Sequence, residues 1–242
     1  MWISIRMSTP CLILQGTGDV VLDAGGNMGY VSISMALKQP DATVVAFEPD
    51  PLNYGLLQMN MALNHVENIC AFNLALGNED GLIHFYRSPN NFGDHRSAKP
   101  KGLDLRETEF NQLAFPVLKV SGQKFISRAF PDVRFDLVKI DTQGADFEIL
   151  GDIMPLLKPS ARVTIEFSPY HLDTHGTRRD DVLRILSAFR CIELILPDSD
   201  RPFRTEQTDV NYLAGYFDDG FKRYKSSHNL GLSMSSWGQT AV

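Results

Sequence analysis

The stretch DAGGNMG at residues 23–29 decides the fold of this chain. The apolar run at 20–22 leads into it, and a helical pattern over residues 30–38 follows it. A buried strand, a glycine-rich turn and a helix form the first unit of a doubly wound α/β nucleotide site. Glycines let the backbone turn sharply and approach a ligand, and the next helix N-terminus offers N–H groups to negative charge. The sequence therefore predicts an α/β fold with a ligand site at this turn.

The glycine spacing of this turn indicates which ligand it binds. A dinucleotide turn follows G-x-G-x-x-G, which the adjacent Gly25 and Gly26 followed by Gly29 do not match. The turn does match acidic-x-Gly-x-x-x-Gly through Asp23, Gly25 and Gly29, a pattern typical of S-adenosylmethionine loops. That cofactor carries an ammonium group that an acidic side chain suits. We predict S-adenosylmethionine here, bound by Asp23, Gly25, Gly26, Asn27 and Gly29; a tight turn without ligand is the alternative.

Length and composition describe an ordinary globular protein. The 242 residues suffice for one large domain with a sizeable core. A net charge of -6 argues against broad nucleic-acid binding. No apolar run approaches the length needed to span a bilayer, and residues 1–6 lack the features of a secretory signal. Cys11, Cys70 and Cys191 lie in or beside apolar runs without metal or disulfide spacing, so we expect buried free thiols, no metal site and a cytoplasmic protein.

Alternating apolar runs and helical patterns predict a doubly wound, mostly parallel sheet with helices on both faces. We expect strands at residues 20–23, 43–47, 69–72, 135–140, 162–167 and 192–196. We expect helices at residues 30–38, from 51 to about 64, and at 145–157 and 177–189, with a strand or short helix at 210–217. The helix that Asp50-Pro51 opens is expected to face the core through residues at helical spacing: Leu52, Leu56, Met59 and Leu63.

The chain divides into three parts on this interpretation. Residues 1–19 form an approach segment, residues 20–224 form the domain, and the Ser- and Gly-rich residues 225–242 form a loose tail. An insert at about 81–134 interrupts the domain between two core strands. Long excursions of this kind are usually functional, so we predict that residues 88–115 form a mobile cover over the ligand site.

Two further segments are placed to contact the cofactor. Glu48 ends the strand at 43–47, about 20 residues after the glycine turn, where a carboxylate suits a ribose diol. Asn73 and Leu74 follow the strand at 69–72, at the edge where an adenine ring lies in such folds. We predict Glu48 on the ribose and Asn73 and Leu74 on the adenine. The alternatives are a helix-capping or surface carboxylate for Glu48 and an exposed turn for Asn73 and Leu74.

Four blocks together resemble the FkbM-type methyltransferase family. They are LDAGGNMGYVSISMA at 22–36, VVAFEPDPLNYGLLQMNMALN at 44–64, NLALGNEDG at 73–81 and DLVKIDTQGADFEIL at 136–150. The resemblance runs from about Gly18 to about Pro169. It implies a class I methyltransferase (Rossmann-like) fold, S-adenosylmethionine as cofactor, and transfer of methyl to a hydroxyl, commonly on a sugar or natural product. The chain departs from the family pattern at Gly26, where alanine is common, and at Gln143, where glutamate is common.

Methyl transfer to an alcohol benefits from precise alignment and from a base that takes the hydroxyl proton. The candidates near the carboxyl ends of the strands are His95, Asp141, Glu166 and His171. We favour His95 as the base because the pKa of histidine lies near neutrality. Asp141 lies at a strand tip, so we predict that it contacts the cofactor and acts as an electrostatic and positioning partner. Glu166 and His171 are interpreted as structural.

Other classes of function remain open at this point. A nicotinamide-dependent oxidoreductase would need the glycine spacing that the turn lacks, and a non-catalytic S-adenosylmethionine-binding module would bind the cofactor without turnover. A catechol-type metal enzyme would need converging carboxylates, for which only Asp141 and Glu166 are placed. We expect a small-molecule acceptor as partner, no nucleic acid and no membrane, with a homo-oligomer left open.

Overall fold

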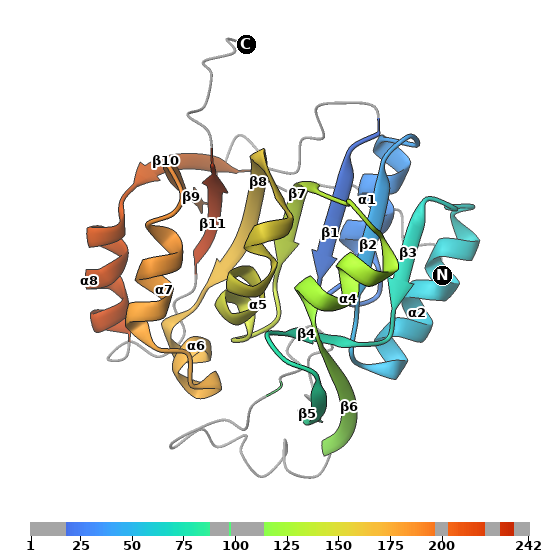
Figure 1. Ribbon diagram of the computed structural model, residues 1–242, viewed down its shortest axis with the longest axis horizontal. Coiled ribbons are helices and arrows are strands. Elements are labelled where there is room, and N and C mark those ends of the chain that lie inside the picture. The colour runs from blue at the N-terminus through green and yellow to red at the C-terminus, as the bar shows by residue number, and fades with distance from the viewer. Residues whose placement is uncertain (1–17, 88–96, 98–113, 197–202, 221–227, 235–242) are drawn as a thin grey trace.

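The computed structural model describes residues 18–87, 97, 114–196, 203–220 and 228–234. Within them, eight strands form one sheet (Figure 1). In their order across the sheet, they are β10 (Arg204–Thr208), β9 (Cys191–Leu196), β11 (His228–Ser233), β8 (Leu157–Phe167), β7 (Phe135–Ile140), β1 (Val20–Ala24), β2 (Thr43–Phe47) and β3 (Ile69–Phe72). Strands β3, β2, β1, β7 and β8 run parallel, which confirms the predicted mostly parallel sheet.

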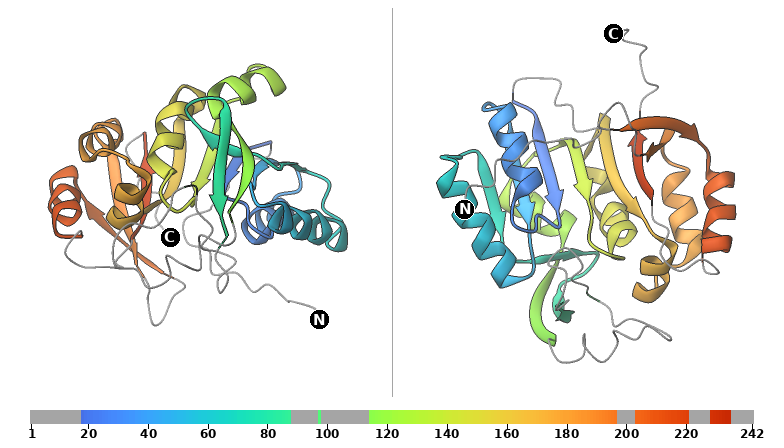
Figure 2. Two further views of the ribbon diagram at one scale, coloured as in Figure 1. Left: turned by 90° about the horizontal axis from the view of Figure 1, so that it is seen from below. Right: turned by 180° about the vertical axis from the view of Figure 1, so that it is seen from behind.

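Helices cover both faces of the sheet. The helical elements are α1 (Tyr30–Lys38), α2 (Pro51–Leu63), α4 (Gly122–Ala129), α5 (Asp146–Ile153) with the 3-10 turn η2 (Met154–Leu156), α6 (Pro169–His175), α7 (Arg179–Leu186) and α8 (Val210–Gly220). The left panel of Figure 2 shows the blue helices α1 and α2 on one side of the sheet and the green to orange helices α4, α5 and α7 on the other. The predicted α/β class is confirmed. No helix in the described ranges is long and apolar enough to cross a membrane.

The insert builds a second, smaller sheet at the carboxyl ends of the main strands (Figure 1). It contains β4 (Ala75–Gly77), β6 (Ala114–Ser121) and β5 (Gly81–Tyr86), in that order. Strands β5 and β6 pair antiparallel. Helix α4, which follows β6, was not predicted. Ser121 caps its N-terminus by accepting a hydrogen bond from the backbone of Lys124 at 3.3 Å.

The inward face of α2 differs from the predicted one. Leu52, Met59 and Leu63 are 47%, 60% and 61% exposed, and Leu56 is only half-buried, whereas Leu57 is fully buried. The prediction that the first four lie in the core is therefore wrong. Helical spacing shows which residues share one face of a helix, but it does not show which face packs against the sheet. In α2 the buried face is narrow and includes Leu57.

Two other predictions are corrected by the structure. The segment 225–242, expected to be loose, contains β11, which pairs antiparallel with both β8 and β9 inside the sheet. Its alternating Leu230 and Leu232 are buried, and this short period-2 pattern is obscured by neighbouring Ser and Gly. Cys70 is exposed on edge strand β3 and Cys191 is half-buried, so the prediction of a buried thiol is wrong for Cys70. Cys11 lies outside the described residues.

Candidate active site

The glycine turn is tied to the carboxyl ends of two neighbouring strands. The backbone N–H groups of Gly25 and Gly26 both donate to Phe47 O at the end of β2, at 3.0 and 2.9 Å. Gly25 has φ +78°, and a Cβ there would lie 2.1 Å from the backbone oxygen of Asp141 at the end of β7. Gly29, with φ +91°, begins α1 without a side-chain cap. The turn therefore needs glycine for close approach at one position and for left-handed backbone at two.

Asp23 belongs to strand β1, which leads into this turn. It is fully buried, and its carboxylate pairs with the Lys139 ammonium at 3.1 Å and accepts from the Ser32 hydroxyl at 2.5 Å. Asp23 and Lys139 are direct neighbours in the parallel register of β1 and β7. The Lys139 ammonium also donates to Gly25 O at 2.7 Å. The Asp23 carboxylate thus supports the glycine turn through Lys139. Its contact with the cofactor stays a prediction.

Lys139 was missed by the sequence analysis. Burial lowers the pKa of its ammonium, but the carboxylates of Asp23 and Asp141 outweigh burial and leave that pKa raised. The lysine is therefore charged inside the sheet. The sequence does contain a signal for this pair: a lysine within the apolar run at 135–140. A charged side chain buried in a central strand needs a partner of opposite charge.

Glu48 holds the glycine turn through its side chain. One carboxylate oxygen accepts from the Asn27 backbone N–H at 2.7 Å, and the other accepts from the Asp50 backbone N–H at 2.8 Å. Burial raises the pKa of Glu48 to about 7, against the lowering effect of those two hydrogen bonds. A carboxylate has about four acceptor positions, and these two hydrogen bonds use half of them. Glu48 is buried between Phe47 and Pro49, which both line the cavity described below.

The predicted adenine residues lie at the same edge. The Asn73 side-chain amide donates to the backbone oxygens of Glu48 and Pro49 at 2.8 and 3.1 Å. Asn73 thereby joins the end of β3 to the end of β2, while Leu74 turns toward the cavity described below. Their contacts with adenine stay predictions.

Asp141, Glu166 and His171 come together, and Gln143 connects them. The Gln143 amide donates to Asp141 at 3.1 Å and to Glu166 at 3.2 Å. The Nδ1 atom of His171 lies 3.4 Å from a Glu166 oxygen. Gln143 is where the family often has glutamate; a third carboxylate here would add repulsion, whereas the amide supplies a donor to both acids. Of the four candidate bases, only His95 lies outside the described residues.

The turn after β7 is held by a buried acid. Asp146 accepts from the backbone N–H groups of Thr142 and Gly144 at 2.9 and 2.7 Å. Burial, with a contribution from Glu166, raises the pKa of Asp146 to about 6. Thr142 Oγ1 is buried and has no hydrogen-bond partner within the described part of the chain. This turn therefore presents an unsatisfied hydroxyl beside the glycine turn.

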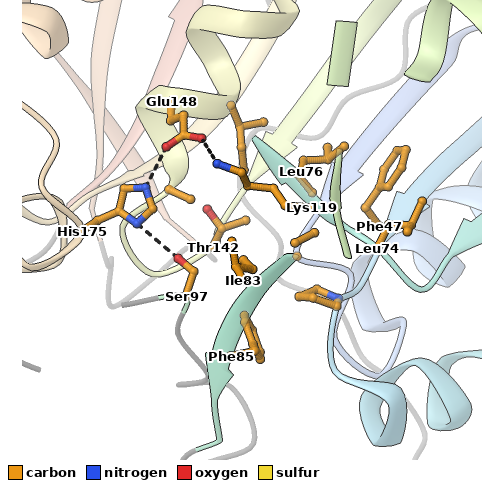
Figure 3. Close-up of a pocket in the computed structure, with 16 residues that line it drawn as sticks. Phe47, Leu74, Leu76, Ile83, Phe85, Ser97, Lys119, Thr142, Glu148 and His175 are labelled. Carbon is orange, nitrogen blue, oxygen red and sulfur yellow. Dashed lines mark hydrogen bonds and ion pairs between the residues drawn. The ribbon is translucent and has the colours of Figure 1, made fainter. Parts of the chain in front are cut away.

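A cavity opens where the two turns meet the insert (Figure 3). Its apolar wall includes residues from the glycine turn, the ends of β2 and β3, and the small sheet: Ala24, Gly25, Phe47, Pro49, Leu74, Ala75, Leu76, Ile83 and Phe85. Its remaining wall comes from β6, the turn after β7, α5 and α6, with one residue of the insert: Lys119, Thr142, Ala145, Glu148, Ile149, His175 and Ser97. The cavity therefore combines the predicted cofactor edge with a polar side that the sequence analysis did not predict.

The polar side was missed because α6 was missed. Ser168 and Pro169 give the same start signal as Asp50-Pro51, and Gly176 gives a stop signal. Ser168 accepts from the His171 backbone N–H at 3.4 Å, as an N-cap does. Recognition of this helix would have placed His171 and His175 one turn apart on one side of it.

The small sheet is anchored to the body by an ion pair whose acidic partner is buried. The Arg87 guanidinium binds both carboxylate oxygens of Asp50, at 2.7 and 2.8 Å, and lies 4.9 Å from the Phe115 ring centre. Asp50 is fully buried and also caps α2. Burial would raise the pKa of Asp50, but Arg87 and the cap hydrogen bonds leave it lowered. The predicted cover at 88–115 lies mostly outside the described residues. Arg87, the residue just before it, is held by Asp50.

Arg87→Ala should loosen the small sheet and remove the guanidinium that binds both oxygens of the buried Asp50 carboxylate. We expect the free energy of unfolding to fall by about 3 kcal/mol, the low end for breaking a buried ion pair. Amide hydrogen exchange in β5 and β6 should also become faster than in β1. Arg179→Ala is the control, because its pair with Asp218 is largely exposed and should contribute under about 1 kcal/mol. Equal losses in the two variants would contradict an anchoring role for Arg87.

The described part of this site does not bring metal ligands together. Within the described ranges, no group of three His, Cys, Asp or Glu side chains is arranged to hold a metal ion. Asp141 and Glu166, the two carboxylates that a catechol-type enzyme would use, are instead bridged by the Gln143 amide.

The fold and the site define a class I methyltransferase architecture: a parallel sheet with antiparallel β11 inserted, and a glycine turn facing an acidic tip on β2. A methyltransferase FkbM structure from Methylobacillus flagellatus matches with TM-score 0.51 and 14% identity over 91% of this chain and 45% of that chain. A fibrillarin/Nop5p complex matches with TM-score 0.50 and 11% identity over 93% and 76% of the respective chains. At these identities the similarity shows the fold alone.

Sequence comparison identifies the family. The methyltransferase FkbM domain model matches residues 23–192, and this chain belongs to that family. Methyltransferase 1 of Beauveria bassiana is 29% identical over 142 residues, which is 54% of this chain and 56% of that protein. Methyltransferase sdnD of Sordaria araneosa is 27% identical over 154 residues, which is 55% and 60% of the respective chains. The matches thus span less than two thirds of either curated relative.

Proposed function

We propose that this protein is an S-adenosylmethionine-dependent methyltransferase that methylates a hydroxyl of a small-molecule acceptor, a sugar or a natural product. The observation that carries the proposal is the cavity bounded by the glycine turn, the ends of β2 and β3 and the turn after β7. Family membership supports methyl transfer, and both curated relatives bear the name methyltransferase. The choice of a hydroxyl acceptor rests on the family resemblance.

The residues present fit this cofactor. Gly25 lines the cavity with backbone alone, and Glu48 keeps acceptor capacity beyond its two backbone hydrogen bonds, which ribose hydroxyls could use. The buried Thr142 hydroxyl lacks a partner in the described structure and lines the same cavity. Phe47, Pro49 and Leu74 provide an apolar wall for adenine. When bound, S-adenosylmethionine supplies an electrophilic methyl group on a sulfonium.

The residues of the chain then contribute alignment and charge. Glu48 fixes both the glycine turn and, on this proposal, the ribose, so turn and cofactor are positioned together. Asp141 lies at the tip of β7 with its backbone N–H bonded to Ala24 O at 3.1 Å, beside the turn. Its carboxylate is exposed and provides negative charge near the cationic cofactor.

An acceptor screen with methyl-labelled cofactor tests the proposal. We expect cofactor binding by calorimetry, and labelled product with at least one hydroxyl compound among sugars and natural products. Binding without S-adenosylhomocysteine release from any acceptor would favour a non-catalytic binding module. A nicotinamide-dependent absorbance change with no cofactor binding would favour an oxidoreductase instead.

Glu48 should make cofactor binding depend on pH. Ribose hydroxyls donate to the ionised carboxylate, so binding requires the proton to leave Glu48, whose pKa is about 7. Affinity for S-adenosylhomocysteine should therefore fall as pH drops below 7, approaching about tenfold per pH unit, and level off above pH 8.

Calorimetry between pH 5.5 and 8.5 measures this dependence on two variants as well. Glu48→Gln keeps the shape of the side chain but cannot ionise, so its affinity should be lower at pH 8 and nearly independent of pH. Glu48→Ala should bind at least about tenfold more weakly at pH 8, from the loss of charge-assisted bonds. Wild-type affinity in Glu48→Ala would remove Glu48 from the ribose.

A further inference from the structure

Four polar side chains on one side of the cavity form a connected chain (Figure 3). The Nε2 atom of His175 lies 2.9 Å from a carboxylate oxygen of Glu148. On the other side of the ring, Nδ1 lies 3.2 Å from the Ser97 hydroxyl. The second Glu148 oxygen pairs with the Lys119 ammonium at 3.3 Å. All four residues line the cavity that includes Gly25 and Phe47.

The ionisation of Glu148 determines which nitrogen of the His175 ring carries the proton. Burial would raise the pKa of Glu148, but the hydrogen bonds from His175 and the Asn78 backbone, with the Lys119 charge, lower it to about 2. An ionised carboxylate only accepts hydrogen bonds, so Nε2 of His175 carries the proton and donates it. In the neutral ring, Nδ1 then holds a lone pair, which accepts from the Ser97 hydroxyl. An alcohol therefore already reaches the basic nitrogen within this cavity.

We propose that His175 is the catalytic base of the reaction, with Glu148 as its positioning residue. This inference rests on the proposed function. The acceptor hydroxyl takes the place of the Ser97 hydroxyl at Nδ1 of His175, and as its oxygen bonds to the methyl carbon, Nδ1 takes its proton. The carbon–sulfur bond of the cofactor breaks, its electron pair stays on sulfur, and S-adenosylhomocysteine is released. Glu148 stabilises the imidazolium that forms, and Lys119 keeps Glu148 ionised and in place.

A second histidine on the same helix gives a matched comparison. His171 lies one turn before His175, is paired with a glutamate at 3.4 Å, and has a side chain 14% exposed against 17% for His175. It packs beside Tyr170 and does not line the cavity. The two histidines therefore share helix, burial and type of partner, and differ in access to the cavity.

His175→Gln should lower turnover by about 10²-fold or more while affinity for S-adenosylhomocysteine changes less than about twofold. At saturating cofactor, where the Glu48 dependence of binding no longer limits the rate, wild-type turnover should rise with pH, and this rise should vanish in His175→Gln. Glu148→Gln should lower turnover less and shift the rise to lower pH, because the imidazolium loses its partner charge. His171→Gln should keep turnover and pH profile near those of the wild type. Undiminished turnover in His175→Gln, or an equal loss in His171→Gln, would overturn the assignment.

The tautomer gives a test that needs no acceptor. Long-range ¹H–¹⁵N correlation spectra at pH 8 should show His175 protonated on Nε2 and unprotonated on Nδ1. A ring protonated on Nδ1 would overturn the proposal whatever the outcome of the acceptor screen. A wild-type protein that binds cofactor but methylates nothing would instead overturn the proposed function, and with it the catalytic role of His175, even with the expected tautomer.

Discussion

Gly25→Ala should destroy the cofactor site and destabilise the whole domain. A Cβ at this position would lie 2.1 Å from the backbone oxygen of Asp141, and φ is +78°. The clash is with backbone in a neighbouring strand end, so no side-chain rotation relieves it. Left-handed strain and overpacking each cost about 1–3 kcal/mol, so we expect the free energy of unfolding to fall by about 2–6 kcal/mol. Urea denaturation measures the loss, and calorimetry should find no cofactor binding.

The adjacent glycine provides the control. A Cβ on Gly26 would meet the Leu57 Cδ1 atom at 3.2 Å, and no positive φ is present there. That methyl group ends a flexible side chain and can give way, so Gly26→Ala should cost under about 1.5 kcal/mol. Similar losses in the two variants would show that the turn tolerates no Cβ anywhere. They would contradict the specific role of close approach between Gly25 and Asp141.

The parallel core of the fold was predictable because its signals are local. An apolar run that ends in a glycine turn and is followed by a helical pattern can form few other structures. Asp50-Pro51 was expected to open a helix, and Asp50 does accept from the Leu52 and Asn53 backbone at 2.7 and 3.3 Å. Strand β11 was not predictable in the same way, because its partners β8 and β9 are distant in sequence and supply most of its stabilisation.

The candidate site was only half predictable for a related reason. The residues at the cofactor edge can be predicted because they follow the carboxyl ends of parallel strands, and these ends lie at the same edge of the sheet. The polar side depends on contacts between elements far apart, such as the 2.9 Å contact of Glu148 on α5 with His175 on α6. From the sequence, His171 was considered as a candidate base and His175 was not, and only the fold shows that His175 is the one that lines the cavity.

Lys139→Met should be among the most destabilising single changes in the sheet. It leaves the Asp23 carboxylate fully buried with only the Ser32 hydroxyl as partner. Breaking a buried ion pair from one side costs about 3–5 kcal/mol, because the remaining charge keeps its desolvation penalty. The change also removes the 2.7 Å hydrogen bond to Gly25 O, so cofactor affinity should fall with stability.

A double-mutant cycle separates the ion pair from the packing of the lysine chain. Asp23→Asn combined with Lys139→Met removes both charges while keeping volumes similar, and replacing a buried pair in this way is often nearly neutral. We therefore expect the double variant to unfold at higher urea than Lys139→Met alone, with a coupling energy of about 1–3 kcal/mol. Strictly additive losses would mean that Asp23 and Lys139 act independently. In that case the charge pair between β1 and β7 would not be what holds the glycine turn in place.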